Sequence, residues 1–393
     1  MSDPWLTIIG IGEDGHAGLS DASREALAGA EIIFGGPRHL ELAGAGGRGR
    51  PWPVPFDIDP VLAEKGRNVV VLTSGDPFWF GAGGRIADHL PGAEYRTLPA
   101  PSVFSLAAAH LGWPIQRSTC LGLHAAPFER LVPVLHPGAR IIATVRDAAA
   151  PAALAAWLVG QGFGATRLHV LERMGGPRQR VRACRADAFD LTDIAAPVAV
   201  ALVVAGGPGL MRGFGLPDAL FATDGQITKR PVRAITLSSL APRPGALLWD
   251  LGAGSGSISV EWCLAGGRAI AVEARADRAS NIAENASRFG VDGLLHVVVG
   301  SAPEAAGGLE APDAVFIGGG ATDRLIADLW SMLSPGVRIV ANGVTLETEA
   351  LLAAEHAARG GALLRIDIAE AAPLGRMRGW AAARPVVQWS AVR

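Results

Sequence analysis

Two glycine-rich stretches, each directly after a run of apolar residues, place the strongest limits on how this chain folds. Residues 250–261 read DLGAGSGSISVE, and residues 69–81 read VVVLTSGDPFWFG. A glycine-rich loop at the end of a strand is typical of α/β proteins in which the backbone approaches a bound molecule closely. The two loops differ so much that neither is a repeat of the other. We therefore expect two separate clefts on one chain.

Length and composition favour two soluble domains. The chain has 393 residues, of which 49% are hydrophobic and 18% charged, with a formal net charge of -2. This balance gives no support to a nucleic-acid partner. The cysteines Cys120, Cys184 and Cys263 lie far apart, so we expect neither a disulfide framework nor a metal site, and a reducing cytoplasm fits. No apolar run predicts a leader or a membrane span.

The first half alternates short apolar runs with helical patterns. This alternation predicts layered α/β structure. A glycine-rich stretch without clear periodicity follows residue 206, so we place the boundary between domains 1–210 and 211–393. Strands are expected at residues 6–11, 31–34, 69–73, 141–145, 167–171 and 198–205, with helices at 22–30 and 148–160.

The second half is more regular, with helical patterns between most of its apolar runs. Its last two runs have no helix-length pattern between them, which predicts a parallel sheet ending in an antiparallel pair, seven strands in all. The expected strands are 246–250, 269–273, 295–299, 314–317, 337–342, 363–369 and 386–390. The expected helices begin near Ser257 and cover 277–288, 322–333 and 347–359.

The glycine loop of the second half has two acidic neighbours. Glu273 ends the next expected strand, where a carboxylate can accept hydrogen bonds from ribose hydroxyls. Asp250 precedes the glycines of residues 252–256 and suits the cationic end of a ligand better than a pyrophosphate. A third glycine of the dinucleotide fingerprint would fall at Ser257, so that fingerprint is imperfect. The loop alone still fits a nicotinamide, a flavin or S-adenosylmethionine.

Residues 213–393 resemble the class I S-adenosylmethionine-dependent methyltransferases, and more narrowly the decarboxylating precorrin methyltransferase domains of cobalamin synthesis. The resemblance rests on QITKRPVR at 226–233, on DLGAGSGSISVE, on AVEARADRASNIAENASRFGV up to residue 291, on GSAPEA at 300–305 and on DAVFIGGG at 313–320. It implies a Rossmann-like fold that binds S-adenosylmethionine. The implied contacts are Thr228, Gly252, Ala253, Gly254, Ser255 and Gly256 at the methionine end, Glu273 at the ribose and Ala302 at the adenine.

The GDP of residues 75–77 reads by itself as an ordinary turn. Its neighbours suggest more, because GIGEDG follows the first strand and Ser102 is placed to cap a helix. Together these stretches resemble the two-lobed tetrapyrrole methylases, the class III methyltransferases, over residues 4–207. In that family S-adenosylmethionine lies between two lobes and is held largely by backbone groups. The residues implied here are Leu72, Gly75, Asp76, Pro77, Ser102, Val103, Met174 and Leu202.

The order of the two halves resembles a fused family that methylates carbons 5 and 15 of a reduced tetrapyrrole and removes a carboxyl group. One S-adenosylmethionine per domain is then expected, without a metal, and the family implies a homo-oligomer, a tetramer through the C-terminal half. No catalytic residue stands out; Asp76, His124 and Arg233 are the candidates. A polycarboxylate substrate needs cations, for which the candidates are Arg38, His39, Lys229, Arg230, Arg233, Arg376 and Arg378.

Two other functions stay open from the sequence. Both broad families include methyltransferases of RNA or protein, although the near-neutral charge disfavours RNA. The second glycine loop also fits a nicotinamide-dependent oxidoreductase. The imperfect fingerprint and the lack of a residue pair for hydride chemistry count against it.

Overall fold

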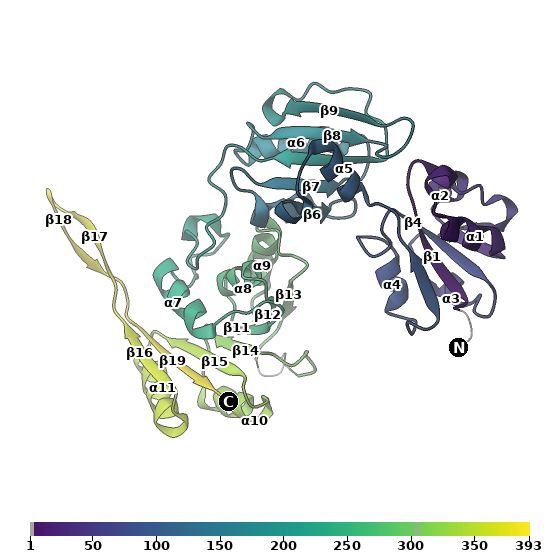
Figure 1. Cartoon of the computed structure of the whole chain (residues 1–393). Helices are drawn as coiled ribbons and strands as arrows, with labels where there is room; N and C mark the ends of the chain where they lie inside the picture. The colour runs from purple at the N-terminus through teal and green to yellow at the C-terminus, as the bar shows by residue number, and fades with distance from the viewer. Residues whose placement is uncertain (1–3, 303–304, 306) are drawn as a thin grey trace. The chain divides into compact units, whose positions relative to one another are not determined.

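The computed structural model describes residues 4–302, 305 and 307–393, and the chain divides into two units (Figure 1). Unit 1 comprises the chain up to Phe128 together with Val134–Pro208. Unit 2 comprises Glu129–Pro133 and Gly209–Arg393. In the part of the chain described, no helix is long and apolar enough to cross a membrane.

Unit 1 begins with a parallel sheet in the order β3-β2-β4-β1-β5. Every residue of β1 is buried because helices cover both faces, as expected of a parallel sheet. The strands are β1 (Leu6–Ile11), β2 (Ile32–Gly35), β3 (Gly49–Pro51), β4 (Val69–Ser74) and β5 (Tyr95–Leu98). The helices are α1 (Asp21–Gly29), α2 (Pro37–Leu42), α3 (Asp59–Leu62) and α4 (Gly83–Ala87).

A second, mixed sheet in the order β6-β7-β10-β8-β9 completes unit 1. Only β6 and β7 pair in parallel; the other pairs are antiparallel. Phe104 of α5 packs with Ile142 and Leu171 in the core under this sheet. The elements are α5 (Val103–Leu111), β6 (Thr119–Gly122), β7 (Arg140–Thr144), α6 (Ala150–Gly160), β8 (Arg167–Glu172), β9 (Arg180–Arg185) and β10 (Val198–Val203).

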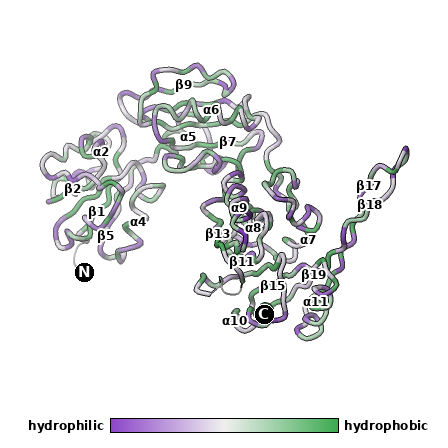
Figure 2. Tube along the Cα trace, turned by 180° about the vertical axis from the view of Figure 1, so that it is seen from behind, coloured by the Kyte–Doolittle hydropathy of each residue, from purple (hydrophilic) through white to green (hydrophobic). Residues whose placement is uncertain are grey.

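Unit 2 is built on a seven-stranded sheet in the order β13-β12-β11-β14-β15-β19-β16. Successive residues of β11 enter opposite cores: Leu248 lies in one and Trp249 in the other, so both faces are covered. Apolar residues concentrate in these strands (Figure 2). The strands are β11 (Leu247–Leu251), β12 (Arg268–Glu273), β13 (Leu295–Val299), β14 (Ala314–Ile317), β15 (Arg338–Gly343), β16 (Ala362–Ile366) and β19 (Val386–Val392).

Within the described residues, the helices that accompany this sheet are α7 (Arg230–Leu240), α8 (Ser257–Leu264), α9 (Ala276–Arg288), α10 (Asp323–Met332) and α11 (Leu346–Arg359). Strand β19 is antiparallel to both of its neighbours, β15 and β16. The remaining strands β17 (Ala369–Leu374) and β18 (Met377–Ala382) pair only with each other, as a separate hairpin. Short 3-10 turns occur at Gly15–Gly18, Gly46–Arg48, Ile115–Arg117, Phe128–Val134, Ala186–Ala188 and Asp218–Leu220.

The predicted fold class is confirmed. The structure is α/β, with two sheets in unit 1 and a mixed seven-stranded sheet in unit 2. The expected antiparallel pair is confirmed as β16 and β19 at the end of the sheet, and β19 also pairs antiparallel with β15. The hairpin β17–β18 was not predicted, nor was α7.

Candidate functional site

The loop after β4 is shaped by close backbone packing. Gly75 has a φ of +57°, and a Cβ atom there would lie 2.8 Å from the Cα atom of Ser102. The Gly75 carbonyl accepts a hydrogen bond from the N–H of Ala100, and its own N–H donates to the carbonyl of Ile11. A side chain at position 75 would therefore push apart the three segments that meet here.

Asp76 and Ser102 act first on the local backbone. The Asp76 carboxylate accepts a hydrogen bond from the N–H of Phe78 at 2.9 Å, which is an Asx turn. The Ser102 hydroxyl accepts from the N–H of Ser105 at 3.2 Å and caps α5, as predicted. Pro77 is buried behind the loop.

A cavity of about 390 Å³ opens next to this loop and is lined by segments of both sheets of unit 1. Of the residues expected at the cofactor, Leu72, Gly75, Ser102, Val103 and Met174 line it. Leu202 does not line it: this side chain is fully buried in β10. Asp76 and Pro77 also lie outside the lining, although both adjoin Gly75.

His124 and Trp79 lie on the cavity wall. The Nδ1 atom of His124 is 3.2 Å from the Thr144 hydroxyl, and the ring is exposed. Trp79 lines the cavity and also packs against the core, where it stacks on Phe104 with ring centroids 4.9 Å apart. Trp249 is buried in β11.

One side of the cavity is polar, and the sequence predicts only some of its residues. His39 Nε2 lies 2.8 Å from the Ser74 hydroxyl, and Arg38 forms an ion pair with Glu13. Burial, and then Arg38, lower the pKa of His39 to about 4, so this imidazole is neutral at neutral pH. Arg146 also lines the cavity. Glu13, Ser74 and Arg146 carry no sequence signal, since only folding brings them together.

The glycine loop of unit 2 is left-handed at alternate residues. Gly252, Gly254 and Gly256 have φ values of +70°, +60° and +70°. A Cβ atom at Gly256 would lie 2.7 Å from a methyl carbon of Ile282, so α9 packs directly on the loop backbone. This geometry explains why the loop carries glycine at each of the three positions.

Glu273 fixes the same loop from the end of β12. Its carboxylate is buried and accepts hydrogen bonds from the N–H groups of Gly254, at 2.8 Å, and Arg275, at 3.0 Å. A carboxylate has about four acceptor positions, so two stay available for hydroxyl groups of a ligand.

Asp250 is a buried carboxyl with one oxygen unused. Its Oδ2 atom accepts a hydrogen bond from the Ser259 hydroxyl at 2.6 Å, whereas Oδ1 is buried without a partner. Burial raises the pKa of Asp250 to about 6. The buried hydroxyl of Ser255 also has no partner. Orphaned acceptors beside an open glycine loop fit a ligand that brings hydrogen-bond donors and positive charge, as a methionine ammonium does.

The segment before α7 crosses this loop. A Cβ atom at Gly254 would be 3.4 Å from the carbonyl oxygen of Gln226. Asn285 holds the crossing in place: its amide exchanges two hydrogen bonds with the backbone of Ala222 and donates a third to the carbonyl of Ser255. Thr228 is half-buried in the same segment. Ala302 is half-buried beside the core under β12, whereas Pro303 and Glu304 of the same motif lie outside the described residues.

Arg233 does not have the placement of a substrate contact. It is fully buried, and all three guanidinium nitrogens donate within unit 2, to Glu261, Asp218 and backbone carbonyls. Its guanidinium also lies 4.8 Å from the ring centre of Phe221. This arrangement is that of a structural ion pair. Lys229 and Arg230, one turn earlier, are exposed.

Comparisons with known proteins agree with both resemblances. Residues 6–190 match the family model of tetrapyrrole (corrin/porphyrin) methylases, and residues 219–393 match that of the precorrin methyltransferase domain. The chain is similar to a precorrin-6Y C(5,15)-methyltransferase [decarboxylating] from Sinorhizobium sp, with 50% identity over 98% of this chain and 96% of that protein. A protein of the same description from Mycobacterium tuberculosis is 37% identical over 99% of this chain and 100% of its own length.

One solved structure is similar to part of the chain. The crystal structure of the C-terminal domain of precorrin-6Y C5,15-methyltransferase from Rhodobacter capsulatus is 59% identical, covers 47% of this chain and 100% of that domain, and has a TM-score of 0.46.

Proposed function

Because the chain belongs to the family of decarboxylating precorrin-6Y C(5,15)-methyltransferases, we propose that it methylates precorrin-6Y at carbons 5 and 15 and removes the ring C acetate carboxyl as carbon dioxide, to give precorrin-8. Residues 1–210 would methylate carbon 5. Residues 211–393 would methylate carbon 15 and carry out the decarboxylation. The pathway is cobalamin biosynthesis.

The observation that carries this proposal is the presence of two unrelated strand-end loops, each with a backbone open to a ligand. In unit 1, Gly75 lies beside a cavity of about 390 Å³. In unit 2, three left-handed glycines lie between the buried carboxylates of Asp250 and Glu273. Two sites of different design on one chain fit two methyl transfers better than one.

We propose one S-adenosylmethionine per unit, which when bound supplies an electrophilic methyl group. In unit 2, Asp250 would face the ammonium group and Glu273 the ribose. The enzyme's part in such a displacement is alignment of the two reacting atoms. In unit 1 the backbone near Gly75 would hold the cofactor, with Ser102, Val103 and Met174 from the cavity wall. Of the two catalytic candidates in unit 1, Asp76 and His124, we retain His124, since it lines the cavity and Asp76 does not.

Incubation of the purified protein with precorrin-6Y and isotope-labelled S-adenosylmethionine tests the proposal. Mass spectrometry should find two added methyl groups and the loss of one carbon dioxide. The 211–393 half expressed alone should retain one methylation with the decarboxylation, and the 1–210 half the other methylation. Absence of label on the tetrapyrrole would contradict the proposal, and label on RNA or protein would favour the alternative.

We also propose that the protein is a homo-oligomer through unit 2, with a tetramer as the expected form, and acts in the cytoplasm. The hairpin β17–β18 supports the oligomer. It stands apart from the seven-stranded sheet, and Leu374, Met377 and Trp380 are 69%, 75% and 79% exposed. An isolated two-stranded hairpin is marginally stable in water, so contact with another copy would stabilise it.

A further inference from the structure

Arg173 has an unusual backbone and an unmatched charge. It follows β8 with a φ of +50°, a conformation that costs free energy for any residue other than glycine and that is concentrated at functional sites. Its N–H donates to the carbonyl of Pro197 at 2.9 Å. The Nε atom is buried without a hydrogen-bond partner, and within the described part of the chain the guanidinium has no ion pair.

A second guanidinium lies close to it. Arg38 lines the cavity of unit 1, and its pKa is lowered by burial and then by the positive charge of Arg173. Glu13 forms an ion pair with Arg38. His39 beside it is neutral, as argued above, and so supplies no negative charge. The Glu13 carboxylate is paired with Arg38, and no ion pair joins it to Arg173 within the described residues.

The register of the strands places a third guanidinium group, that of Arg146, in the same region. Strands β7 and β8 both pair antiparallel with β10, and Ala199 of β10 lies opposite Thr144 of β7 and Leu171 of β8. Arg146 and Arg173 each follow two residues after those positions, so they leave the same edge of the sheet, about 10 Å apart. Arg146 lines the cavity. Within the described residues, its guanidinium forms no hydrogen bond or ion pair.

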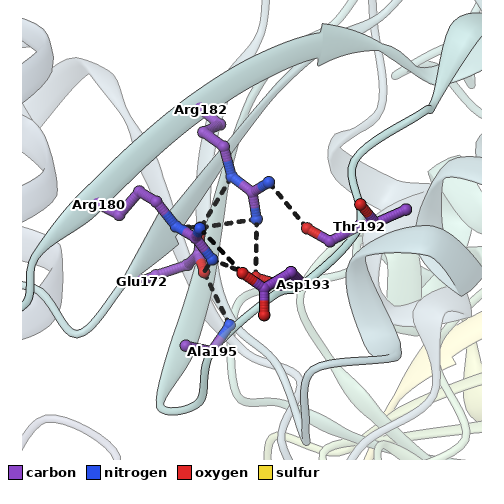
Figure 3. A network of polar contacts seen from close by, with 6 residues as sticks. All are labelled: Glu172, Arg180, Arg182, Thr192, Asp193 and Ala195. Atoms are coloured by element: carbon purple, nitrogen blue, oxygen red, sulfur yellow. Dashed lines mark hydrogen bonds and ion pairs between the residues drawn. The ribbon is translucent and has the colours of Figure 1, made fainter.

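Two other arginines of unit 1 have a carboxylate partner, in contrast to Arg173. Arg180 and Arg182 of β9 share the buried carboxylate of Glu172, and they also bond to the backbone of Thr192 and Asp193 (Figure 3). These arginines serve the structure. A partly buried cation whose Nε atom lacks such a partner is stabilised when an anion binds to it.

We propose that Arg38 and Arg146 on the cavity wall, together with Arg173, which lies outside the lining beside the lining residue Met174, form a carboxylate-binding subsite of the unit 1 cavity that takes a peripheral acid side chain of the tetrapyrrole. This inference rests on the proposed function. It means that the substrate of unit 1 binds at the end of the second sheet where β7 and β8 finish.

The methionine carboxylate of the cofactor is the other source of such an anion. S-adenosylmethionine carries a sulfonium and an ammonium group against one carboxylate, so its net charge is positive. The guanidinium groups of Arg38, Arg146 and Arg173, of which Arg38 is paired with Glu13, disfavour such a ligand and attract a polycarboxylate. We therefore assign the subsite to the substrate.

The test compares Arg173→Gln with Arg178→Gln, an exposed arginine of the same loop that takes part in no described contact. Carbon-13 methyl transfer to carbon 5 of precorrin-6Y is followed by NMR at saturating S-adenosylmethionine. Arg173→Gln should raise the KM for the tetrapyrrole about tenfold or more and weaken the dependence of KM on salt. Arg173→Lys should restore part of the affinity, and Arg178→Gln should match the wild type.

Binding of S-adenosylhomocysteine, measured by calorimetry, separates the two carboxylate sources and also reports on folding. An unchanged Kd in Arg173→Gln with a raised KM supports the subsite. A weakened Kd with an unchanged KM would overturn it in favour of the cofactor, and unchanged values of both would overturn it altogether. A wild-type protein that never methylates carbon 5 would instead contradict the proposed function.

Discussion

Arg233 and Glu261 form an ion pair inside unit 2, with 2.6 Å between Nε and Oε1, and their side chains are 0% and 3% exposed. Glu261 also accepts hydrogen bonds from the N–H groups of Gly215 and Leu216, at 2.6 and 2.9 Å. Since Arg233 lies on α7 and Glu261 on α8, the pair ties the segment before the second glycine loop to the helix after it.

Replacing Arg233 by methionine should destabilise unit 2. The change leaves Glu261 buried without its counter-ion, which costs about 3–5 kcal/mol. Chemical unfolding monitored by tryptophan fluorescence measures the loss. Arg324→Met, on the exposed face of α10, is the matched control and should change stability by less than about 0.5 kcal/mol. An equal effect of both changes would show that the pair contributes nothing specific.

Asp250→Asn should stabilise the cofactor-free protein at neutral pH. The folded-state pKa of Asp250 is raised from 3.8 to about 6, chiefly by burial, so its contribution is most favourable below the unfolded pKa. That contribution is lost as the pH rises through the folded pKa, at a cost on the order of 3 kcal/mol by neutral pH. Asparagine does not ionise and escapes this cost. Unfolding free energies at about pH 4 and about pH 7 should therefore diverge between the two proteins.

The same change should weaken cofactor binding in unit 2, because the carboxylate proposed to face the ammonium group is gone. Calorimetry with S-adenosylhomocysteine on the 211–393 half measures this. Unaltered affinity would remove Asp250 from the proposed site while leaving the pH argument intact.

Glu172→Gln should destabilise unit 1 by about 2–4 kcal/mol. Burial raises the pKa of Glu172, but hydrogen bonds from Arg180, Ala195 and Arg182 outweigh this and lower it overall. A lowered pKa contributes stability above the unfolded value of 4.5 that is lost as the pH falls through the folded value. The deficit of the variant should thus shrink in acid. Asp193→Asn is the control, since that carboxylate is 92% exposed.

Gly75→Ala should slow the unit 1 reaction selectively. The added Cβ atom would lie 2.8 Å from the Cα atom of Ser102 and 3.0 Å from the carbonyl oxygen of Pro101, in a left-handed conformation. The loop must shift, and methylation at carbon 5 should fall about a hundredfold while methylation at carbon 15 continues. Gly84→Ala, which meets no atom within 4 Å, should retain both reactions; loss of both in Gly75→Ala would point to general unfolding instead.

Trp380→Ser should lower the oligomeric mass measured by light scattering. The indole is 79% exposed on β18, and its removal takes apolar area from the surface proposed to contact another copy. Met332→Ser, an exposed apolar residue of α10, should leave the mass unchanged. A monomeric wild type would refute the hairpin as a contact between copies.

Much of the fold could be predicted, because apolar runs followed by glycine mark buried strands. Strands β1, β13 and β14 are predicted to the residue, and the limits of β12 to within one. Strands β5 and β9 could not be predicted, because they lie at sheet edges and carry arginines: Arg96 in one, Arg180 and Arg182 in the other. Helix α7 was missed because Pro231 reads as a helix breaker, although it lies in the first turn, where proline is tolerated.

The residues of the candidate sites also fall into two groups, those that the sequence predicts and those that it does not. Gly75, Glu273 and the loop glycines have local signatures, so sequence places them correctly at strand ends. The unmatched charge of Arg173 has no such signature, since it depends on which side chains fold near it and which do not. The burial of Arg233 is equally invisible in QITKRPVR, where a basic residue reads as a solvated or substrate-facing one.

Strand β19 has a consequence for how the protein is made. It fills the position between β15 and β16, and both of those strands precede it in the chain. During synthesis, which proceeds from the N-terminus, β15 has no neighbour on that side and β16 has no place in the sheet until residues 386–392 leave the ribosome. Unit 1 needs no later segment to close its two sheets. The nascent chain can therefore complete its first domain while the sheet of the second domain still lacks β19.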